Sequence, residues 1–125
     1  MAKTARKPTK YSKAHAQIHQ MFKELQHRLR LDDWDITLNI QPLSELHSSS
    51  VGDCRWDLRN MKAIINVLEP EQNHYDPVFA DIRLTLAHEL IHVVLNPLWD
   101  NTKSDLEDDM REQAVERLAR ALVGV

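Results

Sequence analysis

The chain has 125 residues, a single cysteine and a formal net charge of −3 at pH 7. One thiol cannot form an intrachain disulfide, and the sequence contains no secretory signal and no apolar run of transmembrane length. The composition therefore excludes a disulfide-stabilised secreted scaffold and a membrane-spanning protein, and we expect one domain in a reducing cytoplasm that is long enough to fold without a metal.

The N-terminal 13 residues form a basic segment. Residues 1–13 carry five basic residues and no acid, which leaves −3 − 5 = −8 for residues 14–125. The segment lacks apolar periodicity, so we predict a disordered arm at 1–13 followed by a single domain at 14–125. Such an arm can bind nucleic acid by counterion release, although a solvated terminal segment is the commoner explanation.

The first predicted element is an amphipathic helix over residues 12–30. His15 and His19 in this segment lie four residues apart, but no glutamate lies between them and no third ligand is in view, so we interpret them as surface histidines. The helix is indicated by apolar residues at helical spacing, which are Ile18, Met21, Phe22, Leu25 and Leu29.

Three strands are predicted next. Residues 34–40 alternate apolar and polar side chains, residues 54–58 repeat the alternation, and 63–68 is a short apolar run. The short link 59–61 predicts a hairpin of the second and third strands. We expect a three-stranded, mostly antiparallel sheet.

Two further helices complete an α+β fold. The dipeptide Asp76–Pro77 supplies an N-cap and a proline at the first helical position, and Asn96–Pro97 ends that helix. Ser104 and Glu107 then form a capping box that opens the last helix. The predicted order is a helix, three strands, an active-site helix and a C-terminal helix.

The most specific motif is His88-Glu89-Leu90-Ile91-His92. Residues four apart on an α-helix share one face, so both imidazoles can reach one ion. Zinc accepts neutral imidazole nitrogens, and three protein ligands leave a position open for water. Glu89 lies beside that face, where it could accept a proton without binding the metal.

The residues around the motif predict a buried helix with one polar stripe. Apolar residues cover most of the circumference between 78 and 95. Two histidines on a solvated face are the alternative interpretation, but a polar stripe on a buried helix is costly unless its groups are hydrogen-bonded or bind a metal. This stripe comprises Asp81, Thr85, His88, Glu89 and His92.

The third metal ligand is expected on the last helix. Helical phase places Glu112 just beyond the apolar arc, whereas Glu116 points about 40° further toward solvent. We therefore favour Glu112 over Glu116 as the ligand. Asp108 and Asp109 are candidates to orient a ligand histidine.

Together these residues resemble a gluzincin motif. The segment His88-Glu89-x-x-His92, followed 20 residues later by Glu112-x-x-Val115-x-x-Leu118-Ala119, is similar to minimal gluzincins of phages and bacteria related to the ImmA/IrrE peptidases. Val115 and Leu118 replace the commoner Ala and Phe. The resemblance implies a minimal zincin fold, Zn²⁺ as cofactor, and an edge strand above the active helix in a cytoplasmic, phage-type protein.

The expected function is zinc-dependent hydrolysis of peptide bonds, with metal-activated water and Glu89 as general base. We expect strand 63–68 to bind an extended peptide or protein substrate by strand addition. The alternative is a non-catalytic zincin scaffold that binds a regulator or nucleic acid through its sheet edge and the basic arm 1–13. No residue is assigned to stabilise the oxyanion, and the candidates are His47, His74, Tyr75 and Arg83.

Cys54 offers a different third ligand. Peptide deformylases pair the same histidine motif with an upstream cysteine. In this chain, however, Gly52-Asp53-Cys54-Arg55 lacks the sequence context of that family. We therefore interpret Cys54 as a buried strand thiol.

Overall fold

A computed structural model describes residues 10–42, 52–69, 82–96 and 105–124. The expected start of the active-site helix at Asp76–Pro77 and the basic residues 1–9 lie outside these ranges. None of the described helices has the length and apolar character needed to cross a membrane.

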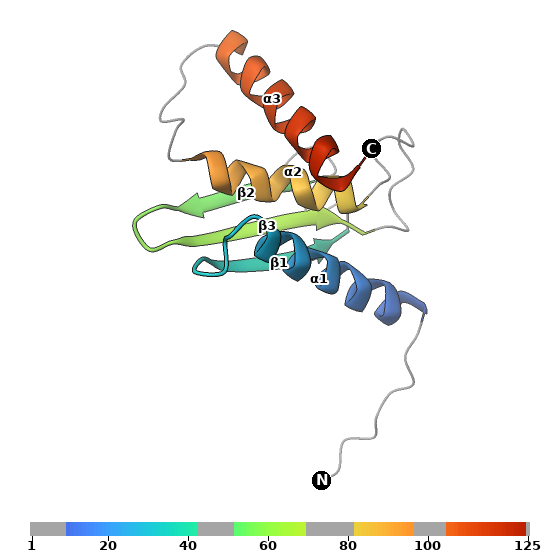
Figure 1. Cartoon of the computed structure of the whole chain (residues 1–125). Coiled ribbons are helices and arrows are strands. Elements are labelled where there is room, and N and C mark those ends of the chain that lie inside the picture. Colours follow the sequence, from blue (N-terminus) through green and yellow to red (C-terminus); the bar gives the residue numbers. More distant parts are fainter. Residues whose placement is uncertain (1–9, 43–51, 70–81, 97–104, 125) are drawn as a thin grey trace.

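The element order confirms the predicted α+β fold (Figure 1). Helix α1 is followed by three strands and two helices, and α2 ends one residue before Asn96 as the Asn96–Pro97 dipeptide predicted. Helix α1 begins two residues earlier than expected. The bounds are α1 Lys10–Arg28, β1 Asp35–Gln41, β2 Gly52–Asp57, β3 Lys62–Leu68, α2 Ile82–Leu95 and α3 Asp105–Val123.

The sheet is mixed, with the strand order β1-β3-β2. Strands β2 and β3 form the predicted antiparallel hairpin, in which Cys54 lies opposite Ile65. Strand β1 pairs with β3 in parallel, with Leu38 opposite Ile65. The chain reverses direction between β1 and β2 and again between β2 and β3. Strands β1 and β3 therefore run the same way and can pair in parallel.

The central position of β3 corrects one prediction. Residues 62–68 pair with β1 on one side, and residues 62–67 pair with β2 on the other. Backbone groups that already bond to neighbouring strands cannot receive an added strand, so 63–68 is not a site for strand addition. Among the described residues, the edges of the sheet are β1 and β2.

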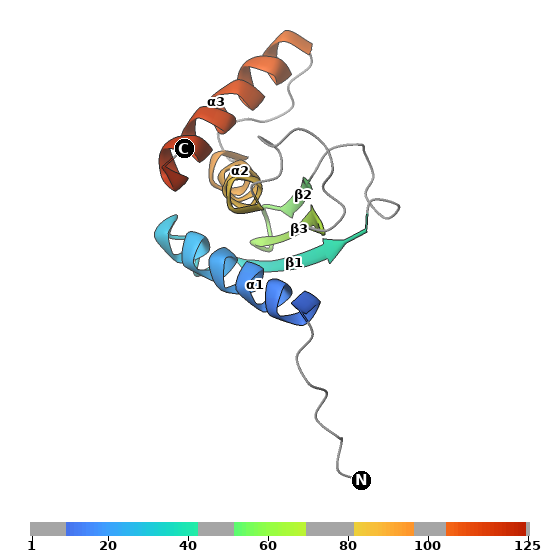
Figure 2. The same ribbon diagram turned by 90° about the vertical axis from the view of Figure 1, so that its right-hand side faces the viewer.

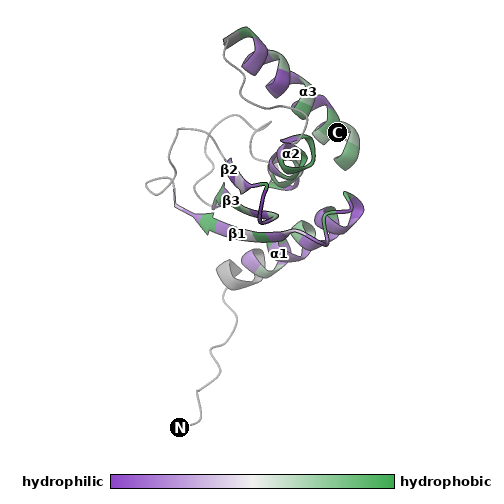
Figure 3. Ribbon diagram, turned by 90° about the vertical axis from the view of Figure 1, so that its left-hand side faces the viewer, coloured by the Kyte–Doolittle hydropathy of each residue, from purple (hydrophilic) through white to green (hydrophobic). Residues whose placement is uncertain are grey.

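One face of the sheet packs against α1 and α2 (Figure 2). Alternate residues of β3 point into this layer, where Ile65 and Val67 are fully buried. Helix α2 is buried on most sides, as its apolar composition predicted, and contributes Leu86 and Leu90 at 0% exposure. Helix α3 packs on α2 from the side away from the sheet, through Val115 and other residues (Figure 3).

A row of hydrogen-bonded polar side chains crosses the opposite face of the sheet. The Asn39 amide donates to Asn66 Oδ1 at 3.1 Å, and the Asn66 amide donates to Asp53 Oδ1 at 2.7 Å. These three residues lie opposite one another in the strand pairing. Because a one-residue slip would separate them, the row fixes the register of all three strands at the end where β2 begins.

Strand β2 begins in close contact with α2. A Cβ atom built on Gly52 would lie 2.9 Å from Thr85 Cγ2, 3.2 Å from the Asn66 carbonyl oxygen and 3.5 Å from Glu89 Cγ. A side chain at this position would force the Thr85 methyl group and the Asn66 carbonyl to move, whereas glycine fits as the structure stands. The edge strand is therefore held directly beside Glu89.

Substitution Gly52→Ala is expected to destabilise the protein by about 1–3 kcal/mol, because the added methyl group overpacks the contact between β2 and α2. Chemical denaturation of the parent and the variant measures the effect. Gly124→Ala is not a suitable control, because Gly124 has a φ of 81°. Ala121→Gly, at an exposed position of α3, reports the cost of an unrelated change in one methyl group. Equal stability of Gly52→Ala and the parent would contradict the close packing.

Candidate metal centre

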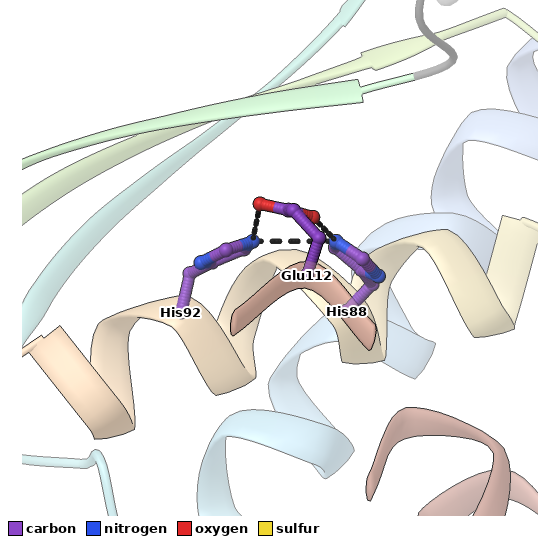
Figure 4. Close-up of side chains that lie close together, drawn as sticks. All are labelled: His88, His92 and Glu112. Atoms are coloured by element: carbon purple, nitrogen blue, oxygen red, sulfur yellow. Dashed lines mark hydrogen bonds and ion pairs between the residues drawn. The ribbon is translucent and has the colours of Figure 1, made fainter. Parts of the chain in front are cut away.

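Helix α2 places His88 and His92 one turn apart on the same face (Figure 4). Their Nε2 atoms lie 3.3 Å from each other, and the ring centroids are 5.0 Å apart. Both side chains are mostly buried, with 18% and 14% of their surface exposed. The two coordinating nitrogens thus converge on one point beside the helix.

Helix α3 brings the carboxylate of Glu112 to the same point. Its Oε2 atom lies 2.9 Å from His88 Nε2, and its Oε1 atom lies 3.0 Å from His92 Nε2. The packing of Val115 and Ala119 against α2 fixes the phase of α3, which turns Glu112 toward the histidines (Figure 4). Glu112, and not Glu116, contacts both Nε2 atoms.

His88, His92 and Glu112 form a group that could hold a metal ion, with one ligand atom from each residue and all three within 4.8 Å of one another. Ligands about 2.0–2.1 Å from a tetrahedral zinc ion are about 3.3 Å apart. The two Nε2 atoms are 3.3 Å apart, close to that value, and a different oxygen of Glu112 approaches each of them, at 2.9 and 3.0 Å. The three side chains therefore surround one point, where a metal ion could bind.

Glu116 lies behind this group and contacts His88 from the other side of the ring. Its Oε2 atom is 3.0 Å from His88 Nδ1, and its Oε1 atom is 3.4 Å from Arg120 Nε. A metal-binding histidine usually donates its second N–H to a carboxylate, which fixes the tautomer and the ring orientation. Asp108 and Asp109 were expected in this role, but Glu116 occupies it, because it lies one helical turn beyond Glu112.

Substitution Glu116→Gln is expected to weaken metal binding by roughly 10- to 100-fold without abolishing it. The amide still reaches His88 but no longer offers a charged acceptor to the Nδ1 proton. Competition with a zinc-binding dye measures the affinity. Gln113→Glu, which adds a carboxylate at an exposed position of the same helix, is the control for nonspecific charge effects. An unchanged affinity in Glu116→Gln would show that the contact does not orient His88.

The charges of the group perturb two pKa values in opposite directions. Burial alone would lower the pKa of His88, but the hydrogen bond to Glu112 and the charges of Glu89, Glu112 and Glu116 raise it overall. Hydrogen bonds from His88 and His92 hold the pKa of Glu112 far below its usual range. The Glu112 carboxylate is therefore ionised at neutral pH, as a metal ligand must be.

Glu89 lies on the neighbouring face of α2 and is buried, with 7% of its surface exposed. Burial raises its pKa to about 7, although the charges of His88 and His92 oppose the shift. A Cβ atom built on Gly52 would lie 3.5 Å from its Cγ, so the side chain lies beside the start of the edge strand β2. A carboxyl group with a pKa near neutrality can both accept and release a proton.

The raised pKa of Glu89 also predicts a pH-dependent stability of the metal-free protein. The folded state keeps the proton up to about pH 7, whereas the unfolded chain releases it near pH 4.5. This contribution to stability is complete below pH 4.5 and is lost as the pH rises through 7. Relative to the parent, Glu89→Gln should gain stability between pH 4.5 and pH 8, by up to about 3 kcal/mol. Urea unfolding at several pH values measures the difference, which would stay constant if Glu89 did not titrate.

Cys54 lies on β2. It does not belong to the group of described residues that could hold a metal ion. It is partly buried and packs against the hydrophobic core. Burial raises the pKa of the thiol well above its usual range, and the negative charges of Glu89 and Asp53 add to the shift. A protonated thiol is a poor metal ligand, which agrees with the interpretation of Cys54 as a strand thiol.

Of the four residues named from the sequence as candidates to stabilise an oxyanion, the structure describes one. His47, His74 and Tyr75 lie outside the described residues. Arg83 is described, and its guanidinium donates to the carbonyl of Val123 at the end of α3, at 3.4 Å. That contact directs Arg83 toward the C-terminal end of α3, about three helical turns beyond Glu112.

Two histidines and a glutamate converge on one point where a metal ion could bind, with a buried carboxylate on the neighbouring face of α2. Comparison of the chain with protein-family models, curated proteins and solved structures finds no match in any of the three. The chemistry of the site is therefore inferred from its own residues.

Proposed function

We propose that this protein is a zinc-dependent metallopeptidase, in which His88, His92 and Glu112 bind the metal and Glu89 is the general base. The observation that carries this proposal is the convergence of three ligand atoms from two helices, with Glu89 buried next to them. A purely structural metal site would have no use for a fourth, buried carboxyl group, which is costly to keep in the core.

The donor set favours zinc over other biological metals. Two imidazoles and one carboxylate are the ligands of many catalytic zinc sites, whereas magnesium and calcium prefer oxygen ligands alone. A bound zinc ion supplies a Lewis acid that polarises a carbonyl group and lowers the pKa of a coordinated water to about 7. His88 and His92 would hold the ion on α2, and Glu112 would join it to α3.

Glu89 provides the proton transfer that hydrolysis requires. Its carboxylate accepts a proton from the attacking water and delivers it to the amine that leaves when the peptide bond breaks. In the metal-free protein burial raises the pKa of Glu89 to about 7, and a carboxyl group in this range can accept a proton and release it again near neutral pH. The adjacent strand β2 keeps bulk water away from one side of this carboxyl group.

Strand β2 is the element that we propose binds the substrate. It is an edge strand among the described residues, and it begins beside Glu89. Every second residue of an edge strand directs its backbone N–H and C=O away from the sheet, where an extended peptide can pair with them. A peptide on this edge would begin its pairing beside Glu89, the residue that follows His88 on α2, and this arrangement supports the similarity to minimal gluzincins.

Metal analysis of the purified protein together with a peptidase assay tests the proposal. We expect about one zinc per chain, cleavage of unstructured peptides, loss of cleavage after chelation and recovery when zinc is added back. Zinc binding without cleavage of any peptide would instead favour the non-catalytic binding scaffold, and absence of metal binding would exclude both.

A further inference from the structure

The hairpin of β2 and β3 carries large apolar side chains that are exposed. Trp56 at the end of β2 is 43% exposed, and Leu58 and Met61 in the turn are 46% and 37% exposed. An isolated exposed apolar residue needs no explanation, but several at one end of an edge strand indicate a binding surface. The position of Trp56 relative to the metal centre suggests what binds there.

Trp56 and Gly52 lie on the same face of the sheet. Positions 52, 54 and 56 lie opposite Val67, Ile65 and Ala63, which are buried on the side of α2, so all three share that face. Gly52 lies beside Glu89, whose Cγ would be 3.5 Å from a Cβ atom built on this glycine. Trp56 lies four residues further along the strand, at a distance of about 13 Å. Figure 1 shows that β2 and α2 run in the same direction, so Trp56 lies toward the His92 end of α2.

We propose that Trp56 is a specificity-determining residue, which selects substrates with a large apolar side chain about four residues from the bond that is cleaved. The proposal rests on the proposed peptidase function. A peptide paired with the edge of β2 places one side chain opposite Trp56 on the face toward α2. The indole ring then packs on that side chain, as aromatic and aliphatic residues do in cross-strand pairs.

The geometry also limits the substrate to extended segments. Only a chain in β conformation can contact both the residues around Glu89 and the indole of Trp56, because a helix of four residues would span about 6 Å instead of about 13 Å. The substrate class is therefore an unfolded segment or a flexible terminus with a leucine, methionine or aromatic residue at the selected position.

Cleavage of a peptide library tests this inference. Peptides from a digested proteome are incubated with the zinc-loaded full-length protein, and mass spectrometry identifies the bonds cleaved. We expect apolar residues to be enriched on one side of the bond, about three to five positions away. In Trp56→Ala the enrichment should fall by a factor on the order of five, whereas Trp56→Phe should retain it. Overall cleavage of peptides without that residue should not change.

Ile64→Ala is the matched control, because Ile64 is 45% exposed and alternates with the buried residues Ala63 and Ile65 on the same strand. It therefore points away from α2, and its removal should leave the cleavage pattern intact. Cleavage without apolar enrichment, or with equal enrichment in Trp56→Ala and the parent, would overturn the role of Trp56 and leave the peptidase function standing. Failure of the zinc-loaded parent to cleave any peptide would overturn both.

Discussion

Glu89→Gln is expected to lower the rate of peptide hydrolysis by roughly 10²- to 10⁴-fold, the range contributed by a positioned general base. Glutamine has nearly the same size and fills the same buried space, but it cannot accept the proton of the attacking water. Initial rates on a peptide that the parent cleaves measure the loss. The zinc content of the variant should equal that of the parent, because Glu89 is not one of the three converging ligands.

The zinc content separates a catalytic role of Glu89 from a structural one. A variant that lost both zinc and activity would show only that Glu89 supports the site. A variant that kept its zinc and cleaved at the parental rate would exclude Glu89 as the base. Glu107→Gln, the same chemical change at an exposed position of α3, is the matched control and should keep both zinc and activity.

Glu112→Ala should weaken zinc binding by more than about 100-fold, since loss of an outer-shell partner alone costs roughly 10- to 100-fold. The substitution removes the carboxylate that contacts both His88 and His92, and with it the link that a metal would make between α2 and α3. Zinc should therefore no longer stabilise the variant, whereas it should stabilise the parent by about 2.7 kcal/mol at a concentration about 100 times the Kd. Thermal unfolding with and without zinc measures this difference.

Cys54→Ser is the control that distinguishes the two candidates for the third ligand. Because Cys54 lies outside the converging group, this variant should bind zinc as the parent does. Loss of zinc in Cys54→Ser with retention in Glu112→Ala would reverse the assignment and indicate a deformylase-like site. Retention in both variants would show that two histidines suffice.

The order of the elements could be predicted from local sequence alone. Apolar spacing in residues 12–30 predicted α1, and alternation predicted β1 and β2. The dipeptide Asn96–Pro97 ended α2 at the expected residue. These signals depend on a few neighbouring residues, so they can be interpreted without knowledge of the tertiary contacts.

The pairing of the strands could not be predicted in the same way. A short link predicted the hairpin of β2 and β3, but the loop before β2 carries no signal for where β1 pairs. The parallel pairing of β1 with β3 moved β3 to the centre of the sheet. As a result, the edge next to Glu89 belongs to β2, and the predicted strand addition at 63–68 was wrong.

The candidate site, like the fold, could be predicted from the sequence only in part. The spacing of His88 and His92 places them on one face of any α-helix, and helical phase favoured Glu112, so the sequence by itself determined which side chains could meet. Only the tertiary structure decided that they do meet, and that Glu116 rather than Asp108 or Asp109 contacts His88. The reason is physical: periodicity follows from the backbone of one helix, whereas contacts between α2, α3 and β2 depend on how their buried faces pack.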